Sequence, residues 1–385
     1  MDFSLTESQK MLKTMVHEFA DKELEPIAAD IDERAEFPCR QFERMAELGL
    51  TGLAFPEKYG GGGCGKIEEI IVDEEIARVS AAVGTILFAS SGLAGWPVYT
   101  YSDEEQRQRF VVPLASGAKI ASFALTEPGA GSDAAAIQTT ALRVPGGYRL
   151  DGTKVFITNG AEAGFVLVFA TLDKKLKHKG ITGFIVEKGT PGFTVAKIEH
   201  KLGIRASSTA ELVFEDCFVS DSNRLDAEGE GFKIAINAID SSRVSVAAQG
   251  LGIARGAFEK ALAYAKDRQQ FGQPIADFQA IQWMLADMAT QMDAARLLTY
   301  RAAYLQEHGQ PFIKESSMAK LFSAEAAMFV TTKALQIHGG YGYIKSFPLE
   351  RYFRDARILE IYEGTSEIQR RTIARQLLRD GHSAA

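Results

Sequence analysis

The chain has 385 residues, of which 46% are hydrophobic and 24% charged, and its formal net charge is −7. A chain of this length exceeds what one hydrophobic core usually organises, so we expect a globular protein of two or three packed domains. The acidic balance, with no block of like charges, argues against nucleic acid as a partner. Three cysteines without C-x-x-C spacing and six scattered histidines predict neither a disulfide framework nor a metal site.

The first part of the chain, residues 1–119, is predicted to be a helical domain. Thr6 and Gln9 form a capping-box signal, and apolar residues follow them at helical spacing. Residues 79–102 carry no charge and are long enough to span a bilayer, but their serines, threonines and glycines disfavour insertion. We therefore expect a buried helix there and no membrane insertion. The N-terminus shows no signal-peptide pattern, so we expect a cytoplasmic protein, with a processed protein of the mitochondrial matrix as the alternative.

The middle part, residues 120–228, changes to a β-rich pattern. Residues 139–150 read as strand, turn and strand, and four further short runs rich in β-branched and aromatic residues follow. Such spacing predicts an antiparallel barrel or sandwich. From residue 229 to 385 helical periodicity returns, which predicts a C-terminal four-helix set. The order of elements predicts an α+β fold of three domains, with two independent domains joined by a linker as the alternative.

A glycine-rich segment, Phe123–Asp133, follows the first predicted strand of the middle domain. It contains a G-x-G-x-x-A pattern beginning at Gly129, which matches a dinucleotide-binding fingerprint. That fingerprint requires a helix and a parallel strand after the glycines, whereas a hairpin is predicted here, so we reject a Rossmann domain. The hydroxyls of Thr126 and Ser132 and the glycine backbone still suit a phosphate or a ring edge, although a plain β-turn explains the same residues.

Two further segments place aromatic and polar side chains together. Lys154–Gly160 alternates apolar and polar residues, so Phe156 and Thr158 would share one face of a strand. Further along, Arg268 could hold a phosphate and Phe271 could pack on an aromatic ring. On these residues alone, an ordinary strand and a helix-terminal cation are the simpler interpretations.

The most specific motif, Ile358–Gln369, lies near the C-terminus. Ser366 and Gln369 form a capping-box signal, which places Glu363 on the loop before a helix. Apolar residues precede this carboxylate, and desolvation would raise its pKa, as a general base at neutral pH requires. His338, at the end of an earlier helix, is the alternative base, but a histidine there more often caps or packs.

Together these segments resemble the acyl-CoA dehydrogenase family over the whole chain and in the same order. Phe123–Asp133 and Arg351–Arg371 look like the family's two signature segments. Lys201–Arg205, Phe214–Cys217 and Ala295–Leu298 are most similar to the short-chain, or butyryl-CoA, branch. The resemblance implies an N-terminal all-α domain, a central β-domain and a C-terminal four-helix bundle. It also implies FAD at the seam of the last two domains, in a homotetramer built as a dimer of dimers.

The resemblance further implies which residues form the site. Glu363 falls on the family's usual catalytic position, whereas Ser242 occupies the position that supplies the base in the isovaleryl and long-chain branches. The contacts implied for FAD in the same chain are Phe123, Leu125, Thr126, Gly131, Ser132, Phe156, Thr158, Thr365 and Glu367. Those implied mainly for FAD of a neighbouring subunit are Arg268, Phe271, Gln279, Gln336, Gly339 and Gly340. The acyl-CoA contacts implied are Ser132, Asp240, Arg243, Tyr362 and Gly364.

The implied activity is α,β-dehydrogenation of a short-to-medium-chain acyl-CoA to a trans-2-enoyl-CoA, as in fatty-acid β-oxidation. Glu363 would take the α-proton, the β-carbon would give hydride to the flavin, and an electron-transfer flavoprotein would accept the electrons. The alternatives are a dehydrogenase for branched or cyclic acyl-CoA and an oxidase-like flavoenzyme; a non-catalytic acyl-CoA-binding protein is disfavoured because Glu363 is present. Trp96 could shorten the acyl pocket or simply fill the core.

Overall fold

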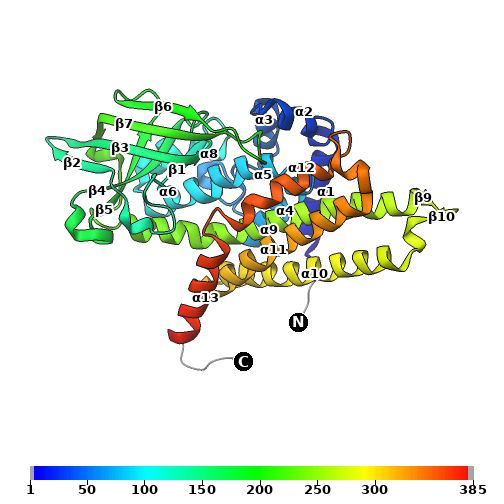
Figure 1. Cartoon of the computed structure of the whole chain (residues 1–385). Helices are drawn as coiled ribbons and strands as arrows, with labels where there is room; N and C mark the ends of the chain where they lie inside the picture. The colour runs from blue at the N-terminus through cyan, green and yellow to red at the C-terminus, as the bar shows by residue number, and fades with distance from the viewer. Residues whose placement is uncertain (1–3, 380–385) are drawn as a thin grey trace.

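The computed structural model describes residues 4–379, which form helices, then strands, then helices (Figure 1). Residues 1–3 and 380–385 lie outside the described residues. Part of the N-terminal segment considered for a signal peptide, the start of the first predicted domain and the end of the last one therefore also lie outside them. The β-rich part lies at one end of the molecule, and long helices extend away from it to the other end (Figure 1).

The N-terminal part is helical, as its sequence predicts. Thr6 caps α1 by accepting a hydrogen bond from the Gln9 N–H, in the predicted capping box. The helical run Ala81–Tyr101 is long and apolar enough to cross a membrane, but 83% of its most apolar window is buried inside the structure, as in a core helix. The elements are α1 (Glu7–Phe19), η1 (Ala20–Leu24), α2 (Ala28–Arg34), α3 (Cys39–Glu47), η2 (Glu57–Tyr59), α4 (Lys66–Val79), α5 (Ala81–Phe88), η3 (Ala89–Gly95), α6 (Trp96–Tyr101), α7 (Glu104–Gln106), η4 (Arg107–Val111) and α8 (Val112–Ala115).

The middle part forms one eight-stranded sheet in the order β6-β7-β3-β2-β4-β5-β8, with β1 paired to β4. The predicted hairpin is confirmed, because β2 and β3 pair antiparallel. The sheet is mixed. Its other pairings are antiparallel, as predicted, but β1 runs parallel to β4, and β2 meets β4 in parallel at Thr140 and Thr171. The elements are β1 (Ala121–Ala124), η5 (Ala134–Ala136), β2 (Thr140–Val144), β3 (Gly147–Thr158), β4 (Phe165–Thr171), η6 (Lys174–Gly180), β5 (Ile181–Glu187), β6 (Phe193–Ile198), β7 (Thr209–Ser220), η7 (Asp221–Asn223) and β8 (Arg224–Leu225).

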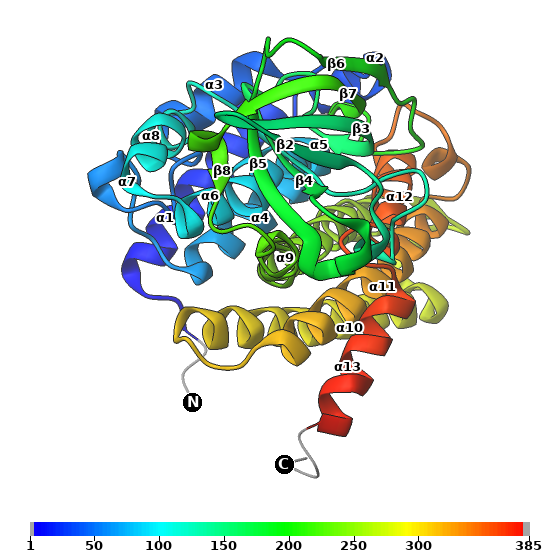
Figure 2. The ribbon, with the colours of Figure 1, turned by 90° about the vertical axis from the view of Figure 1, so that its left-hand side faces the viewer.

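The central strands of this sheet are buried on both faces. One face packs on α6, η4, α8 and the first turns of α9, through side chains such as Phe165 and Ile185. On the other face, Tyr148, Phe184 and Phe214 pack with neighbouring strands. β4 and β5 are therefore apolar along nearly their whole length, as strands covered on both faces usually are. Figure 2 shows α9 beneath the strands, with α10 and α11 beneath α9.

The C-terminal part is built around α9, a helix of 37 residues. Its glycines let α4 approach closely: a Cβ at Gly252 or Gly256 would lie 2.3 or 2.1 Å from a backbone oxygen of α4. α11 packs along another side of α9, so the position of α9 is fixed from both sides. The elements are α9 (Gly231–Asp267), β9 (Gln269–Gln270), β10 (Gln273–Pro274), η8 (Ile275–Asp277), α10 (Gln279–Glu307), α11 (Ile313–His338), η9 (Gly339–Tyr343), α12 (Leu349–Ala356), η10 (Arg357–Glu360) and α13 (Ser366–Arg379).

Candidate active site

Glu363 lies on the short loop between η10 and α13, as predicted. Its backbone is left-handed, with φ of +52°, and so is that of Gly364, with φ of +90°. The predicted capping box is wrong. Thr365 Oγ1, not Ser366, accepts a hydrogen bond from the N–H three residues on. Gln369 Nε2 instead donates to the carbonyl oxygens of Glu363 and Gly364, each at 3.0 Å, because the left-handed turn brings both carbonyls over the start of the helix.

Glu363 is half-buried, and Ser242 of α9 and Lys320 of α11 both act on its carboxylate. Ser242 Oγ donates a hydrogen bond to Glu363 Oε2 at 2.7 Å. Burial raises the pKa of Glu363, while the Ser242 hydrogen bond and the charges of Arg243 and Lys320 each offset part of that rise. The net change is upward, in agreement with the sequence-based expectation. A carboxylate whose pKa is raised in this way accepts a proton more readily than an exposed one.

Aromatic and amide side chains form one wall beside the carboxylate. The Tyr362 O–H donates to Gln249 Oε1, and Gln249 Nε2 donates to Thr85 Oγ1 at 2.7 Å. Phe88 lies one turn further along the same helix, and its ring meets Tyr362 edge-on with centroids 6.4 Å apart. Phe88 is only 5% exposed. The wall is therefore continuous from α9 to α5.

Trp96 packs elsewhere. Its ring meets Tyr101 edge-on at 6.1 Å, and the Tyr101 hydroxyl accepts a hydrogen bond from Asn237 Nδ2 at 2.7 Å. Asn237 lies one turn before Asp240 on α9. The ring that meets Tyr362 is Phe88, and Trp96 itself is half-buried.

Asp240 and Arg243, which the resemblance assigns to acyl-CoA, form an ion pair with each other. Both are buried, at 6% and 5% exposure. Arg243 lies under the Glu363 loop, because a Cβ at Gly364 would be 3.8 Å from Arg243 Nη2. From this position Arg243 acts electrostatically on Glu363. Its contact with acyl-CoA stays a prediction.

Thr126, Phe156 and Thr158 come together where the loop after β1 meets β3. The N–H of Val155 donates to the Thr126 carbonyl at 2.9 Å. The register of β3 against β7 shifts in this stretch, and such a bulge re-aims a side chain. Phe156, with φ of +60°, points outward and is 66% exposed, whereas its two sequence neighbours are buried. Phe156 and Thr158 therefore share the outward face, as predicted.

The loop after β1 is held to β3 by a buried ion pair. Lys154, which is fully buried, donates to Glu127 Oε1 at 2.7 Å and to the Leu125 carbonyl at 3.0 Å. Glu127 also accepts hydrogen bonds from backbone N–H groups at the far end of the loop. Gly131 and Ser132 lie exposed between these anchors. The ion pair therefore fixes both ends of the loop that carries the Thr126 and Ser132 hydroxyls.

Three other residues assigned to FAD differ in exposure. Leu125 is 5% exposed, so any contact it makes would use its backbone. Phe123 is half-buried and packs on Phe169, with ring centroids 5.0 Å apart. Glu367 is exposed in the first turn of α13, next to the Thr365 cap.

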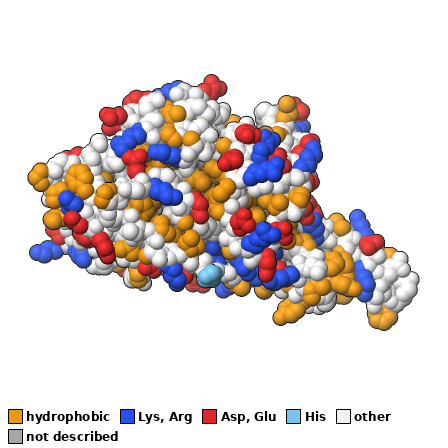
Figure 3. All heavy atoms as spheres, turned by 90° about the horizontal axis from the view of Figure 1, so that it is seen from above, with side chains coloured by type: hydrophobic (Ala, Val, Ile, Leu, Met, Phe, Trp, Pro, Cys, Tyr) orange, Lys and Arg blue, Asp and Glu red, His pale blue; other side chains and the backbone are white. Residues whose placement is uncertain are grey.

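The remaining residues assigned to FAD lie at the far end of the long helices. Arg268 follows α9, and its guanidinium lies over the Tyr341 ring at 5.6 Å. Phe271 is 94% exposed, and Gln279 begins α10. Figure 1 places this end opposite the β-rich part, and Figure 3 shows exposed hydrophobic side chains there, so one chain does not unite the two clusters. The other members of this second cluster, at the end of α11, are Gln336, Gly339 and Gly340.

Family models cover nearly the whole chain. The N-terminal, middle and C-terminal domains of acyl-CoA dehydrogenase match residues 6–118, 122–217 and 229–378. The chain belongs to the acyl-CoA dehydrogenase family. Members of this family are FAD-dependent oxidoreductases that act on a CH–CH group.

Individual relatives are similar over their full length. Acryloyl-CoA reductase (NADH) of Anaerotignum propionicum is 50% identical, over 98% of this acyl-CoA dehydrogenase and 96% of the relative. The structure of butyryl-CoA dehydrogenase from Megasphaera elsdenii is 44% identical, with a TM-score of 0.97 over 98% of this chain and 100% of that chain. A chain in a structure described as the electron transferring flavoprotein of Acidaminococcus fermentans is 49% identical. Its TM-score is 0.97, over 99% of this chain and 100% of that chain.

The residues of this acyl-CoA dehydrogenase fit FAD. The exposed ring of Phe156 offers a stacking surface. Thr158 lies two residues along the same strand, and the Thr126 carbonyl accepts from the N–H of the neighbouring Val155. Around Gly129 and Gly131 the backbone is open, because a Cβ at either would meet nothing within 4 Å. Open N–H groups in a glycine loop suit a phosphate. These residues would hold the ring system and the pyrophosphate.

Sequence reasoning missed three residues that shape the site: Phe88, Lys320 and Gln369. Gln369 was assigned to a cap, and Phe88 sits in a long uncharged run in which nothing distinguishes it from the other apolar residues. Lys320 did leave a signal, because it is a single cation among small and apolar residues on one face of a long helix. A charged residue on such a face is rarely buried without a specific partner.

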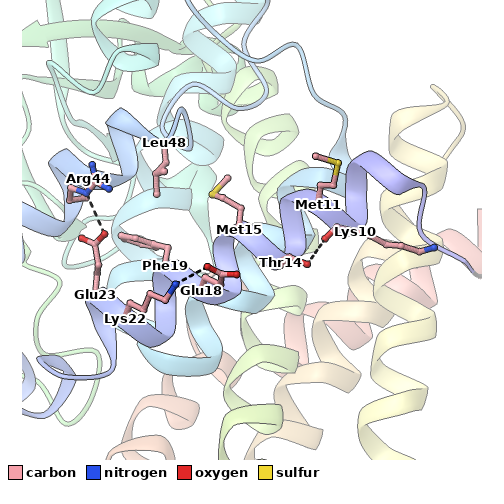
Figure 4. Close-up of a pocket in the computed structure, with 10 residues that line it drawn as sticks. All are labelled: Lys10, Met11, Thr14, Met15, Glu18, Phe19, Lys22, Glu23, Arg44 and Leu48. Atoms are coloured by element: carbon pink, nitrogen blue, oxygen red, sulfur yellow. Dashed lines mark hydrogen bonds and ion pairs between the residues drawn. The ribbon is translucent and has the colours of Figure 1, made fainter.

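A separate groove lies between α1, η1 and α3 (Figure 4). Apolar side chains of Met11, Met15, Phe19 and Leu48 lie along it, and charged groups border it. None of its lining residues belongs to the Glu363 site.

Proposed function

We propose that this acyl-CoA dehydrogenase oxidises a short-to-medium-chain acyl-CoA to the trans-2-enoyl-CoA, with Glu363 as the base. The observation that carries the proposal is the half-buried Glu363 carboxylate, with Oε2 bound by Ser242 Oγ at 2.7 Å and its pKa raised by burial. The similarity to a structure named butyryl-CoA dehydrogenase supports a short acyl chain.

The side chains around the loop would divide the work. Ser242 binds Oε2, which leaves Oε1 of Glu363 to take the α-proton. Gln369 fixes the turn at Glu363 and Gly364, so the direction of the carboxylate is set before substrate binds. FAD, when bound, supplies the acceptor for the hydride that leaves the β-carbon. Tyr362, held by its hydroxyl, would shield one side of the carboxylate from water.

The raised pKa of Glu363 predicts a loss of activity on the acid side. Only the ionised carboxylate accepts a proton, so kcat/KM should be full above this pKa and fall as the pH drops through it. Because burial raises the pKa, the fall should begin at a higher pH than for an exposed glutamate, whose pKa is about 4.3. The measurement is kcat/KM against pH with FAD in excess. A profile that stays flat down to about pH 4 would contradict the assignment.

We propose that Phe88 ends the acyl pocket. One side of its ring meets Tyr362. It also lines a cavity of about 40 Å³, together with Leu53, Val72 and Leu87. Tyr362 is not among the residues that line that cavity, so Phe88 would separate the cavity from an acyl chain bound beside Glu363.

Phe88→Ala is expected to shift preference toward longer acyl chains, because it would open the cavity behind Phe88 to an acyl chain bound beside Glu363. The ratio of kcat/KM for octanoyl-CoA to that for butyryl-CoA should rise roughly tenfold or more, the discrimination that one methylene gives in an apolar pocket. Phe110→Ala, which removes a buried ring elsewhere in the core, is the matched control for lost stability. An unchanged ratio in a folded Phe88→Ala protein would rule out Phe88 as the end of the pocket.

The substrate proposal is tested by reduction of the bound flavin. The purified protein, loaded with FAD and kept without oxygen, is titrated with butyryl-, octanoyl-, isovaleryl- and cyclohexanecarbonyl-CoA. Straight chains are expected to bleach the flavin at the lowest concentrations. Bleaching only by branched or cyclic substrates would favour that alternative, and no bleaching at all would refute the proposal.

We further propose an electron-transfer flavoprotein as the acceptor, because a 49% identical chain occurs in a structure described by that name. An oxidase-like enzyme would instead form peroxide stoichiometrically in air, with or without the acceptor. One relative is named acryloyl-CoA reductase (NADH), so reduction of an enoyl-CoA is a second candidate. NADH oxidation dependent on enoyl-CoA would reveal it.

We also propose a homotetramer, built as a dimer of dimers, in the cytoplasm. The tetramer is supported by the two separate clusters, since a neighbouring chain would have to bring the Arg268 end to the Phe156 end of its partner. Light scattering after gel filtration tests the tetramer. Cell fractionation tests the location.

A further inference from the structure

Lys320 lies on the face of α11 that packs against α9 and the start of α13. Its side chain is fully buried, at 0% exposure, and its Nζ donates to the Gly364 carbonyl oxygen at 2.6 Å. Burying an ammonium group is costly unless hydrogen bonds and opposite charges compensate. This lysine reaches the loop that carries Glu363 from a different helix than Ser242 does.

The loop needs external support because its backbone is strained. Glu363 has φ of +52°, a conformation that side chains with a Cβ rarely adopt unless the surrounding structure imposes it. Two buried donors grip its carbonyls. Gln369 Nε2 on α13 donates to those of Glu363 and Gly364, and Lys320 Nζ on α11 donates to that of Gly364. With the backbone held, the carboxylate is directed to Ser242.

We propose that Lys320 is a positioning residue for Glu363, which clamps the Gly364 carbonyl and places a positive charge behind the base. The inference rests on the proposed function, in which Glu363 removes the α-proton. Lys320 acts through the loop backbone and through its charge.

The charges around the pair set the direction of the effect. Lys320 faces Glu363 itself, Arg243 on α9, Glu360 on η10 and Glu367 on α13, and Arg243 is paired with Asp240. Burial lowers the pKa of Lys320 to about 8, against the opposing effect of Glu363. Lys320 is therefore mostly protonated at neutral pH, and its charge lowers the pKa of Glu363. Removing that charge should raise the pKa of Glu363.

Three variants separate the clamp from the charge. Lys320→Met removes both, Lys320→Gln keeps a hydrogen-bond donor without the charge, and Lys320→Arg keeps the charge. Lys333→Met is the matched control, because Lys333 lies on the same helix and its Nζ sits over the Phe329 ring. Each holoenzyme is assayed with butyryl-CoA for kcat and KM against pH, and thermal unfolding confirms that each is folded.

A second readout does not depend on turnover. Acetoacetyl-CoA has an acidic α-proton, and Glu363 can remove it without any hydride transfer. The enolate that forms in the site is followed by absorbance against pH. The midpoint reports the proton affinity of Glu363 in each variant, and FAD content is measured separately.

For Lys320→Met we expect kcat to fall roughly tenfold to a hundredfold, as for loss of one hydrogen bond to a charged group, with little change in KM. The pH at which its kcat falls on the acid side and the pH midpoint of enolate formation should both be higher than in the wild type. Lys320→Gln should recover part of kcat and keep the pH shift. Wild-type kcat and pH midpoints in folded Lys320→Met or Lys320→Gln would overturn the proposal. If Lys320→Met does not fold, Lys320→Gln and Lys320→Arg decide it. An inactive wild-type enzyme that still forms the enolate would refute the proposed function and leave this inference standing.

Discussion

The Glu363→Gln protein is expected to keep its fold and its FAD and to lose dehydrogenase activity. Glutamine has nearly the shape of glutamate, and its amide oxygen can still accept the hydrogen bond from Ser242 Oγ. The amide cannot accept the α-proton. We therefore expect kcat to fall by roughly 100-fold to 10,000-fold, the usual contribution of a positioned general base. Rapid-mixing absorbance with butyryl-CoA measures the rate of flavin reduction, and the absorbance of gel-filtered protein gives FAD occupancy.

Glu325→Gln is the matched control for this result. Glu325 lies on α11 and forms a surface ion pair with Arg370, so the same chemical change there should leave the activity within about twofold of the wild type. If Glu363→Gln retained a tenth or more of the wild-type rate while fully loaded with FAD, another group would be the base. His338 would then be tested first. It is buried, however, stacks on Tyr264 and bonds to the carbonyl of its own helix, as a packing residue does.

The position of Glu363 could be predicted from sequence because its signals are local. The residue stands beside a glycine, after an apolar stretch and before a helix, and the structure has it on that loop. The details could not be predicted. A Ser-x-x-Gln pattern predicts a capping box, but the same glutamine can equally bind carbonyls that a left-handed turn brings within reach. Which partner Gln369 takes depends on the backbone at Glu363 and Gly364, which the pattern does not encode.

In the fold, too, features with a local sequence signal could be predicted and features without one could not. The hairpin of β2 and β3 is a local pairing, and its turn residues predict it. The parallel pairing of β1 with β4 joins strands separated by that hairpin, and no short pattern records it. Phe88 and Lys320, like that parallel pairing, depend on contacts between parts of the chain that are far apart in sequence. Each reaches the Glu363 loop from a distant helix, and only the packing of α5, α9 and α11 brings them there.

Three residues assigned to catalysis or to FAD share one backbone feature. Phe156, Phe271 and Glu363 all have positive φ, at 60°, 54° and 52°, although none is glycine. Such conformations persist where surrounding contacts impose them, and they concentrate at functional sites. At Phe156 the bulge in β3 turns the ring outward, and at Glu363 the two carbonyl clamps hold the turn. The same backbone feature also occurs at six of the described residues outside the assigned site, so these particular contacts, and not positive φ alone, indicate a functional position.

The Lys154→Met protein is expected to be much less stable and to bind FAD poorly. Lys154 is fully buried, and its ammonium bonds to Glu127 Oε1 at 2.7 Å and to the Leu125 carbonyl at 3.0 Å. Replacing it leaves the Glu127 carboxylate buried without its cation, which typically costs about 3–5 kcal/mol of unfolding free energy. The loop that carries Thr126 and Ser132 also loses its anchor on β3. Denaturant unfolding measures the first effect, and flavin retained after gel filtration measures the second.

The double variant Lys154→Met with Glu127→Gln separates stability from FAD binding. Its neutral amide removes the unpaired charge and can still accept the hydrogen bond from the Thr139 N–H, so part of the stability should return. FAD binding should stay weak, because the link from β3 to the loop is still missing. Lys188→Met, at an exposed lysine of the same domain, should change neither quantity. If the double variant recovered FAD binding together with stability, the ion pair would contribute only to the stability of the fold. If FAD binding stayed weak in a stable protein, the ion pair holds the loop in the conformation that the flavin requires.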